Sequence, residues 1–153
     1  MCEYCGCQAV AAIDELTREH DRALDHVREA EQAAAAIDLD RARTACDQLR
    51  AILGPHTAVE EQGLFPALAA DFRAKLEVLE AEHRRIESVI DGLRDPRPTW
   101  QTELCDAMSM LRTHILKEQD GVFPAALATL TVADWQTVDD VRTSVGSAVA
   151  GTS

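Results

Sequence analysis

One two-part pattern occurs twice in this chain, and the repeat limits what the chain can fold into. A His-x-x-x-Glu motif with Gly-x-Phe-Pro-Ala close behind it fills residues 56–67 and again residues 114–125. A leucine four residues before a histidine, with a glutamate directly before that histidine, precedes each copy at residues 16–20 and 79–83. In a helix, residues four apart lie on one face about a turn apart. The chain is therefore two copies of a unit in which a helix with a histidine precedes a helix with His-x-x-x-Glu.

Composition and apolar spacing predict an all-α fold. The 153 residues suffice for one domain with a buried core, and aromatic residues make up only 4% of them. Apolar residues spaced three and four apart indicate four long helices and a shorter, amphipathic C-terminal helix. Gly54-Pro55, directly before His56, predicts a kink or a restart of the second helix. The expected helices are residues 9–36, a stretch from a break at 38–40 to a bend or end at Pro66, residues 72–93, 100–119 and 131–149.

The expected organisation has three parts. A cysteine-containing leader covers residues 1–8, the four-helix bundle covers residues 9–130, and the C-terminal amphipathic helix with its tail covers residues 131–153.

Six polar residues occupy positions in the apolar stripes of these helices. A core would be more stable with leucine at all six, and burying a glutamate without a partner costs several kcal/mol. A hydrogen-bonded core histidine, or a local His–Glu pair worth a few tenths of a kcal/mol, is the plainer interpretation of any one of them. Their occurrence on four helices at matching positions favours metal binding instead. The six are His20, His56, Glu60, His83, His114 and Glu118.

The residue types narrow the choice of metal. Imidazole and carboxylate ligands without thiolate suit iron, manganese or zinc. Carboxylates from two helices can bridge two ions, as in carboxylate-bridged di-iron bundles, with the four histidines as terminal ligands, two per ion. Octahedral ions would keep open positions for a small molecule such as dioxygen.

The order of these motifs resembles the hemerythrin-like, or HHE cation-binding, domain over about residues 12–128. The resemblance implies an antiparallel four-helix bundle around two non-haem iron ions, joined as an Fe-O-Fe or Fe-OH-Fe centre. It makes Glu60 and Glu118 the candidate bridges and the four histidines the terminal ligands. It also implies a protein that binds or senses dioxygen, nitric oxide, peroxide or iron.

The chain departs from hemerythrins proper at two points. Those proteins carry a fifth histidine in a His-x-x-x-His pair on the third helix, whereas the neighbours of His83 here are Leu79 and Glu87. Either Glu87 replaces the missing imidazole as a metal ligand or the site has one protein ligand fewer. Those proteins also place an aspartate five residues after the last histidine, whereas Glu118 lies four after His114. Both differences favour sensing, or peroxide and nitric oxide chemistry, over reversible oxygen storage.

Four functions compete. A binding or sensing protein is the first expectation, and catalytic activity is left undecided. The second is a catalase-like enzyme that decomposes peroxide at the two irons, with Glu87 as its acid–base group if it is not a ligand. The third is a regulatory module in which iron stabilises the bundle and a partner protein reads the folded state through the C-terminal helix or the cysteine leader. The fourth is a structural bundle without metal.

The net charge and the cysteines limit the possible partners and the cellular compartment. A net charge of −12 argues against nucleic acid and anionic lipid as partners. No apolar run is long enough for a membrane helix and no secretion signal is evident, so the cytoplasm is the expected compartment. The cluster Cys2-x-x-Cys5-x-Cys7 indicates either metal or redox chemistry or a leader with incidental cysteines. Cys46 and Cys105 are expected to be small buried thiols.

Overall fold

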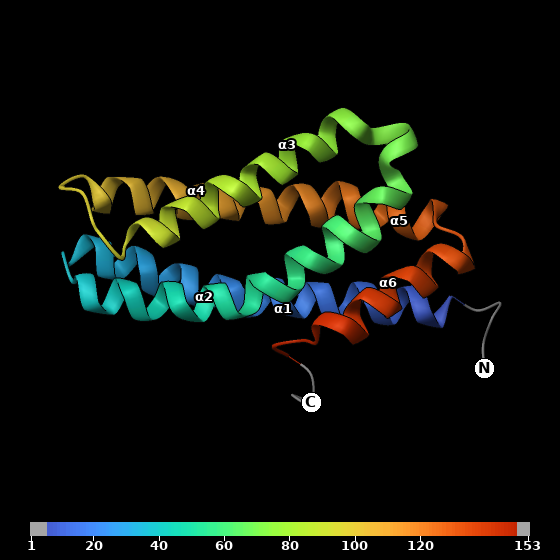
Figure 1. Ribbon diagram of the computed structural model, residues 1–153, viewed down its shortest axis with the longest axis horizontal. Coiled ribbons are helices and arrows are strands. Elements are labelled where there is room, and N and C mark those ends of the chain that lie inside the picture. The colour runs from blue at the N-terminus through green and yellow to red at the C-terminus, as the bar shows by residue number, and fades with distance from the viewer. Residues whose placement is uncertain (1–5, 150–153) are drawn as a thin grey trace.

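The computed structural model describes residues 6–149, which form helices joined by short turns and contain no strand. Figure 1 shows α1 to α4 lying side by side, with successive helices running in opposite directions. α1 packs against α2 and α4, and α3 packs against α4 and α2, so the expected all-α four-helix bundle is confirmed. The helices are α1 (Cys7–Ala35), α2 (Leu39–Val59), α3 (Phe65–Gly92), α4 (Trp100–Lys117), α5 (Phe123–Thr129) and α6 (Val132–Val145). Within residues 6–149, no helix is long and apolar enough to cross a membrane.

Two π-helical turns follow directly on the His-x-x-x-Glu motifs. They are η1 (Glu60–Leu64), between α2 and α3, and η2 (Glu118–Val122), between α4 and α5. At the end of η1 the backbone N–H of Phe65 donates to the carbonyl of Glu60, five residues back. In η2 the N–H of Phe123 donates to the carbonyl of Glu118 in the same way. A proline follows each phenylalanine and has no N–H for the α-helical ladder. The bend or end predicted at Pro66 is therefore a wider turn, through which the helix continues.

Two predicted helix boundaries differ from the structure. α2 continues through Pro55 to Val59, so the expected restart at this proline is wrong. The third helix starts at Phe65 rather than at residue 72, and it bends at Phe72, where φ is −129° and ψ is 18°. The break in apolar spacing near residue 72 thus marks a bend within α3 rather than its start.

The apolar core has two parts, one towards each end of the bundle. Val27, Leu49, Ile90 and Leu104 belong to the first part, which also contains a run of small alanines on α1 and α2. The second part joins the N-terminal end of α1 to η1, α5 and α6, and includes Leu16, Leu64, Phe65, Leu79, Phe123 and Trp135. The layer between the two parts is polar, and it contains the histidines and glutamates of the repeat.

The two cysteines inside the predicted helices, Cys46 and Cys105, differ in burial. Cys46 is buried, as expected, and burial raises the pKa of its thiol to about 11, so it is unreactive at neutral pH. Cys105 is exposed, so that expectation is wrong. It follows buried Leu104 by one residue, which turns it about 100° away from the buried face. Cys7 is exposed at the start of α1, while Cys2 and Cys5 lie outside the described residues.

The C-terminal helix α6 lies across η1 and the first half of α1. Its Trp135 and Val138 are buried in the second part of the core. A Cβ atom at Gly63 would lie only 3.1 Å from the Cα of Val138, so a side chain there would require α6 to shift by a few tenths of an ångström. At the matching position of the second repeat, Gly121, a Cβ would have no described atom within 4 Å.

We predict that Gly63→Ala lowers the free energy of unfolding by about 1–2 kcal/mol, because the added methyl group pushes α6 away. Gly121→Ala is the matched control, since it adds the same methyl group in open space and removes the same helical glycine. Urea unfolding followed by tryptophan fluorescence measures both. Equal effects of the two substitutions would contradict the close approach of α6 to Gly63.

Candidate metal centre

The six polar stripe residues meet in the middle of the bundle. α1, α2, α3 and α4 each contribute one histidine, while Glu60 and Glu118 are the first residues of the two π-helical turns. All six side chains are buried, and both glutamates are fully so. They form two sets of possible metal ligands, His20–His56–Glu60–Glu118 and His83–His114–Glu60–Glu118, each with its ligand atoms within 4.8 Å of one another. Each set takes its histidines from one repeat, and the two sets share both glutamates.

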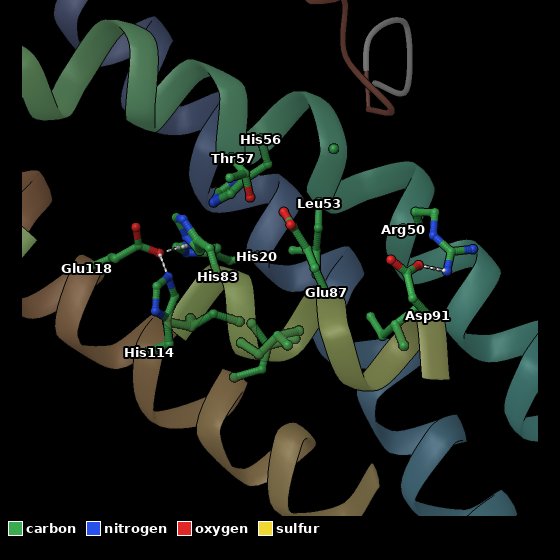
Figure 2. Close-up of a pocket in the computed structure, with 15 residues that line it drawn as sticks. His20, Arg50, Leu53, His56, Thr57, His83, Glu87, Asp91, His114 and Glu118 are labelled. Atoms are coloured by element: carbon green, nitrogen blue, oxygen red, sulfur yellow. Dashed lines mark hydrogen bonds and ion pairs between the residues drawn. The ribbon is translucent and has the colours of Figure 1, made fainter. Parts of the chain in front are cut away.

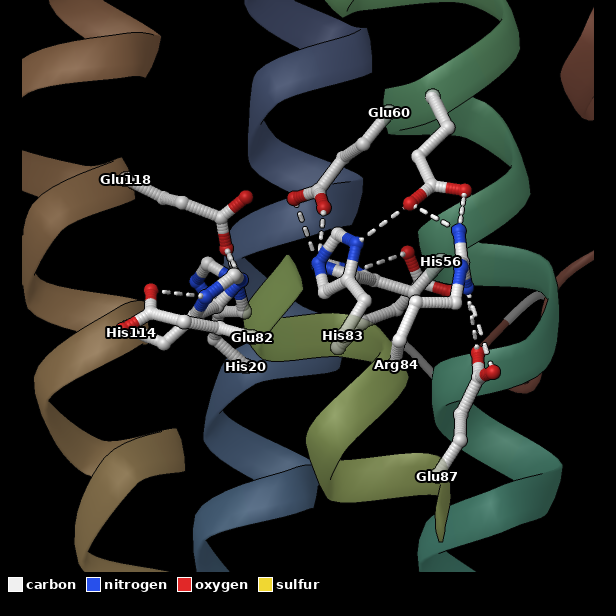
Figure 3. A network of polar contacts seen from close by, with 11 residues as sticks. His20, His56, Glu60, Glu82, His83, Arg84, Glu87, His114 and Glu118 are labelled. Atoms are coloured by element: carbon white, nitrogen blue, oxygen red, sulfur yellow. Dashed lines mark hydrogen bonds and ion pairs between the residues drawn. The ribbon is translucent and has the colours of Figure 1, made fainter. Parts of the chain in front are cut away.

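The shared glutamates face the imidazoles at close range (Figure 3). Glu60 Oε1 lies 2.8 Å from His56 Nε2, and its Oε2 lies 3.3 Å from His83 Nε2. Glu118 Oε1 lies 3.1 Å from His114 Nε2 and 3.2 Å from His20 Nε2. Each carboxylate thus stands between a histidine of one repeat and a histidine of the other. This is the position of a ligand that bridges two ions.

Several of these buried atoms make no hydrogen bond of good geometry, although the ion-pair distances above bring a partner atom close to all of them except Glu118 Oε2. They are Glu60 Oε1 and Oε2, Glu118 Oε2 and His114 Nε2. A buried polar atom left unpaired costs about 1–3 kcal/mol, and such atoms are rare in folded proteins. Metal ions held by these oxygens and nitrogens would satisfy them. The residues present therefore fit a pair of metal ions.

A second ring of polar residues holds the histidines by their other nitrogen. Each Nδ1 lies within hydrogen-bond distance of a carboxylate or amide oxygen. This oxygen accepts a hydrogen bond from Nδ1–H, which leaves Nε2 to bind a metal. The four pairs are His20 with Gln119 at 2.9 Å, His56 with Glu19 at 3.3 Å, His83 with Glu61 at 3.0 Å and His114 with Glu82 at 3.1 Å.

This second ring follows the repeat. The glutamate directly before the first histidine of a repeat holds the second histidine of that same repeat, as Glu19 and Glu82 show. The residue directly after the glutamate that both sets share holds a histidine of the other repeat, as Glu61 and Gln119 show. These four roles were not predicted from the sequence. The signal was present in the repeated Glu-His pairs, but the crossed pairing depends on how the helices face one another.

Cations balance the three carboxylates of the second ring. Arg142 of α6 binds fully buried Glu19 with Nη2 at 2.6 Å and Nη1 at 3.1 Å. Lys117 Nζ lies 2.8 Å from Glu82, and Arg84 pairs with Glu61. Burial acts to raise the pKa of Glu19, but the hydrogen bonds and charges of His56 and Arg142 outweigh it and hold this pKa below its usual value.

The seventh candidate ligand, Glu87, belongs to neither set. Its side chain is 54% exposed and lies 3.2 Å from Arg84 Nη1 (Figure 3), and it also lines the cavity that reaches the histidines. The structure brings together the other six candidates without it.

A cavity of about 190 Å³ leads from the surface between α2 and α3 to the polar layer (Figure 2). Apolar side chains such as Ile86, Leu111 and Ile115 line it beside the histidines. At its surface end Arg50 and Asp91 form an ion pair of 2.6 Å. The arrangement admits a small molecule to the histidine side of the layer, between apolar walls that also carry Thr57 and Glu87.

The charges of the layer shift the pKa values of its members. Burial lowers the pKa of His56 and His83, but the facing carboxylates outweigh it and raise these values to about 10 and about 9. Burial raises the pKa of Glu60, but the same histidines outweigh it and hold it well below its usual value. In the metal-free protein at neutral pH, both histidines therefore carry a proton beside an ionised glutamate.

We predict that metal binding at pH 7.5 releases two or more protons per chain, because only neutral imidazole binds a metal, His56 and His83 must each lose one, and the facing carboxylates raise the pKa of His114 as well. The affinity for metal should accordingly rise with pH up to about 9–10, where these histidines are neutral even before a metal binds. Adding ferrous or zinc ions to weakly buffered protein with a pH indicator measures the release. His26→Ala, which lies outside the layer, should leave it unchanged. Metal binding without acidification would contradict the charge state.

We predict that Arg142→Gln destabilises the metal-free protein by about 3 kcal/mol, because it takes the arginine from buried Glu19 and leaves His56, at 3.3 Å, as its cationic partner. Arg84→Gln is the matched control. Its side chain is 55% exposed, so losing its ion pair should cost less than about 1 kcal/mol. Urea unfolding of both variants measures the difference. Similar losses in the free energy of unfolding would show that the buried Arg142–Glu19 pair contributes no more than an exposed one.

The comparisons with known proteins agree with this geometry. A family model described as the hemerythrin HHE cation-binding domain matches residues 11–126. No curated protein and no solved structure matches the chain at a significant level.

Proposed function

Because the chain belongs to the hemerythrin HHE cation-binding domain family, which makes it a metal-binding protein, we propose that its metal centre holds two non-haem iron ions and that it binds or senses a small ligand there. The sharing of buried Glu60 and Glu118 between the two ligand sets carries this proposal. One set contains the histidines of the first repeat, the other those of the second.

The ligand types support iron and a paired centre. Each set offers two imidazoles and two shared carboxylates, which suits iron, with manganese and zinc as the competing ions. Four protein ligands per ion leave positions open on an octahedral metal. When bound, the two irons would supply redox chemistry and a place for the small ligand. Glu87 is left out of the proposed ligands, because it pairs with Arg84 at the surface.

The size of the cavity supports a small ligand. The cavity encloses about 190 Å³ between apolar side chains and the polar Thr57 and Glu87, so it excludes bulky molecules. Dioxygen, nitric oxide and peroxide are small enough to enter. The Nδ1 partners keep each imidazole in one tautomer and orientation, and Glu19, Glu61 and Glu82 make three of them stronger metal ligands.

Binding or sensing stays the first candidate and peroxide decomposition the alternative. Glu87, the candidate acid–base group, lines the cavity that reaches the histidines and also pairs with Arg84, so either function is compatible with its position. One contact favours the iron-dependent regulatory module as the second candidate: Arg142 joins α6 to Glu19, and Glu19 holds His56. A change at the metal centre therefore has a direct route to the C-terminal helix. The cytoplasmic location and the absence of nucleic acid or membrane partners stay predictions.

We predict about two irons per chain for protein purified from iron-supplemented cells, and different losses in two kinds of variant. Glu60→Ala removes a ligand of both ions, so iron content should fall well below one per chain. His56→Ala removes a ligand of one ion and should leave about one, because the set with His83 and His114 stays intact. Metal analysis by mass spectrometry measures both, with His26→Ala as the control. Equal losses in the two variants would contradict the sharing of Glu60, and zinc alone in the native protein would contradict iron.

A further inference from the structure

An uncovered apolar groove lies beside the second repeat. It encloses about 510 Å³ between α3, η2 and the start of α5. Leu76, Leu79 and Val122 line it, and Val78 at its edge is 52% exposed. The groove lies apart from the metal centre and its cavity, so the proposed metal does not account for it.

The first repeat has the counterpart of this groove, and there α6 covers it. The repeat aligns Leu76 with Ile13 and Gly121 with Gly63. Ile13 packs in the same part of the core as Trp135 and Val138 of α6, and Gly63 meets Val138 directly. In Figure 1, α6 crosses α1. No described residue reaches the matching place at Gly121. The second repeat therefore presents the groove that α6 fills in the first repeat, without a helix on it.

The charges of the two grooves are exchanged. In the first repeat the groove carries the acids Glu15 and Glu19, and the docked helix brings the cation Arg142 to both. In the second repeat Val78 stands at the position of Glu15. Lys117 of α4 already supplies the cation for Glu82, the counterpart of Glu19.

The groove of the second repeat has a further lysine, which the groove of the first repeat lacks. Lys75 is exposed at the edge of the groove, at the position that Ala12 occupies in the first repeat. A helix docked here would meet Lys75 and Lys117, with the one acid Asp120 beside them, where α6 meets two glutamates.

We propose that this groove docks an amphipathic helix of a partner protein, with an apolar stripe like that of α6 and an acidic residue where α6 has Arg142. The apolar stripe would cover Leu76, Val78 and Val122, and the acid would face the lysines. The α6 helix of a second copy fits less well, because its Arg142 would meet Lys75 and Lys117. The proposal does not depend on which metal the centre holds.

The test uses the full chain and two fluorescein-labelled peptides with the sequence of residues 131–146. One peptide keeps the arginine of position 142 and the other has glutamate there. Fluorescence anisotropy should show saturable binding of the glutamate peptide. The arginine peptide should bind about fivefold more weakly, as the loss of an exposed charge pair implies. No saturable binding of the glutamate peptide, or tighter binding of the arginine peptide, overturns the proposal.

Variants of exposed groove residues locate the binding. Val78→Asp should weaken binding of the glutamate peptide about tenfold, because it removes an apolar contact and adds a repelling charge. Lys75→Glu should weaken it as well. Val10→Asp and Arg73→Glu are matched controls, since they make the same kinds of change at exposed positions that do not line the groove. Loss in both groove variants with retention in both controls supports the proposal, and any other pattern among folded variants overturns it.

The amide signals of two glycines separate the two grooves. In ¹⁵N-labelled full-length protein, the glutamate peptide should shift the signal of Gly121 and leave that of Gly63 in place. A shift at Gly63 would mean that the peptide displaces α6 from the first repeat, which overturns the proposal.

Discussion

The contact between two buried glutamates and four imidazoles is the interaction on which the rest of the structure depends. Glu60 and Glu118 have no exposed surface, and their oxygens lie 2.8–3.3 Å from histidine nitrogens of both repeats. A carboxylate in such a place is stable only if cations surround it. Protonated histidines fill that role without metal, and metal ions would fill it in their place. The layer thus divides the apolar core into two parts and makes the fold sensitive to whatever occupies its centre.

The sequence predicts this layer well because its residues repeat at helical spacing. Each histidine of the layer replaces an apolar residue in a stripe, so the spacing by itself makes His20 and His83 recognisable. The second ring is different, because Glu61 and Gln119 hold histidines from the opposite repeat. Such crossed pairs depend on how helices face each other, which one-dimensional spacing does not record.

Other residues mislead for local reasons. Glu87 borders the face of His83 by spacing and lines the cavity beside it, whereas its carboxylate pairs with Arg84 and lies outside both ligand sets, so its role as a ligand stays a prediction. Pro55 predicts a restart from its missing N–H, but α2 continues through it. The bend at Phe72 looked like a helix start because a bend and a start both interrupt apolar spacing. Arg142 was out of reach of prediction, since its partner Glu19 is distant in sequence and lies on another helix.

The two ligand sets contain the same types of residue, but the residues that hold their histidines differ. On one side Glu19 holds His56 and is itself held by Arg142 from α6, whereas on the other Lys117 serves Glu82 from within the bundle. A neutral amide, Gln119, holds His20, whereas the charged Glu61 holds His83. A carboxylate partner makes an imidazole a stronger ligand than an amide does. The two ligand sets therefore differ electronically, and among the described residues only the set with His20 and His56 connects to the C-terminal helix, through Glu19 and Arg142.

The most direct test of the shared-glutamate centre is anomalous diffraction at the iron edge from crystals of the iron-loaded protein. We expect two iron peaks about 3.5–4 Å apart, the spacing of paired metal sites. One iron should lie beside His20 and His56, the other beside His83 and His114, with Glu60 and Glu118 reaching both. A single iron peak, or two irons that do not share these glutamates, would contradict the shared centre.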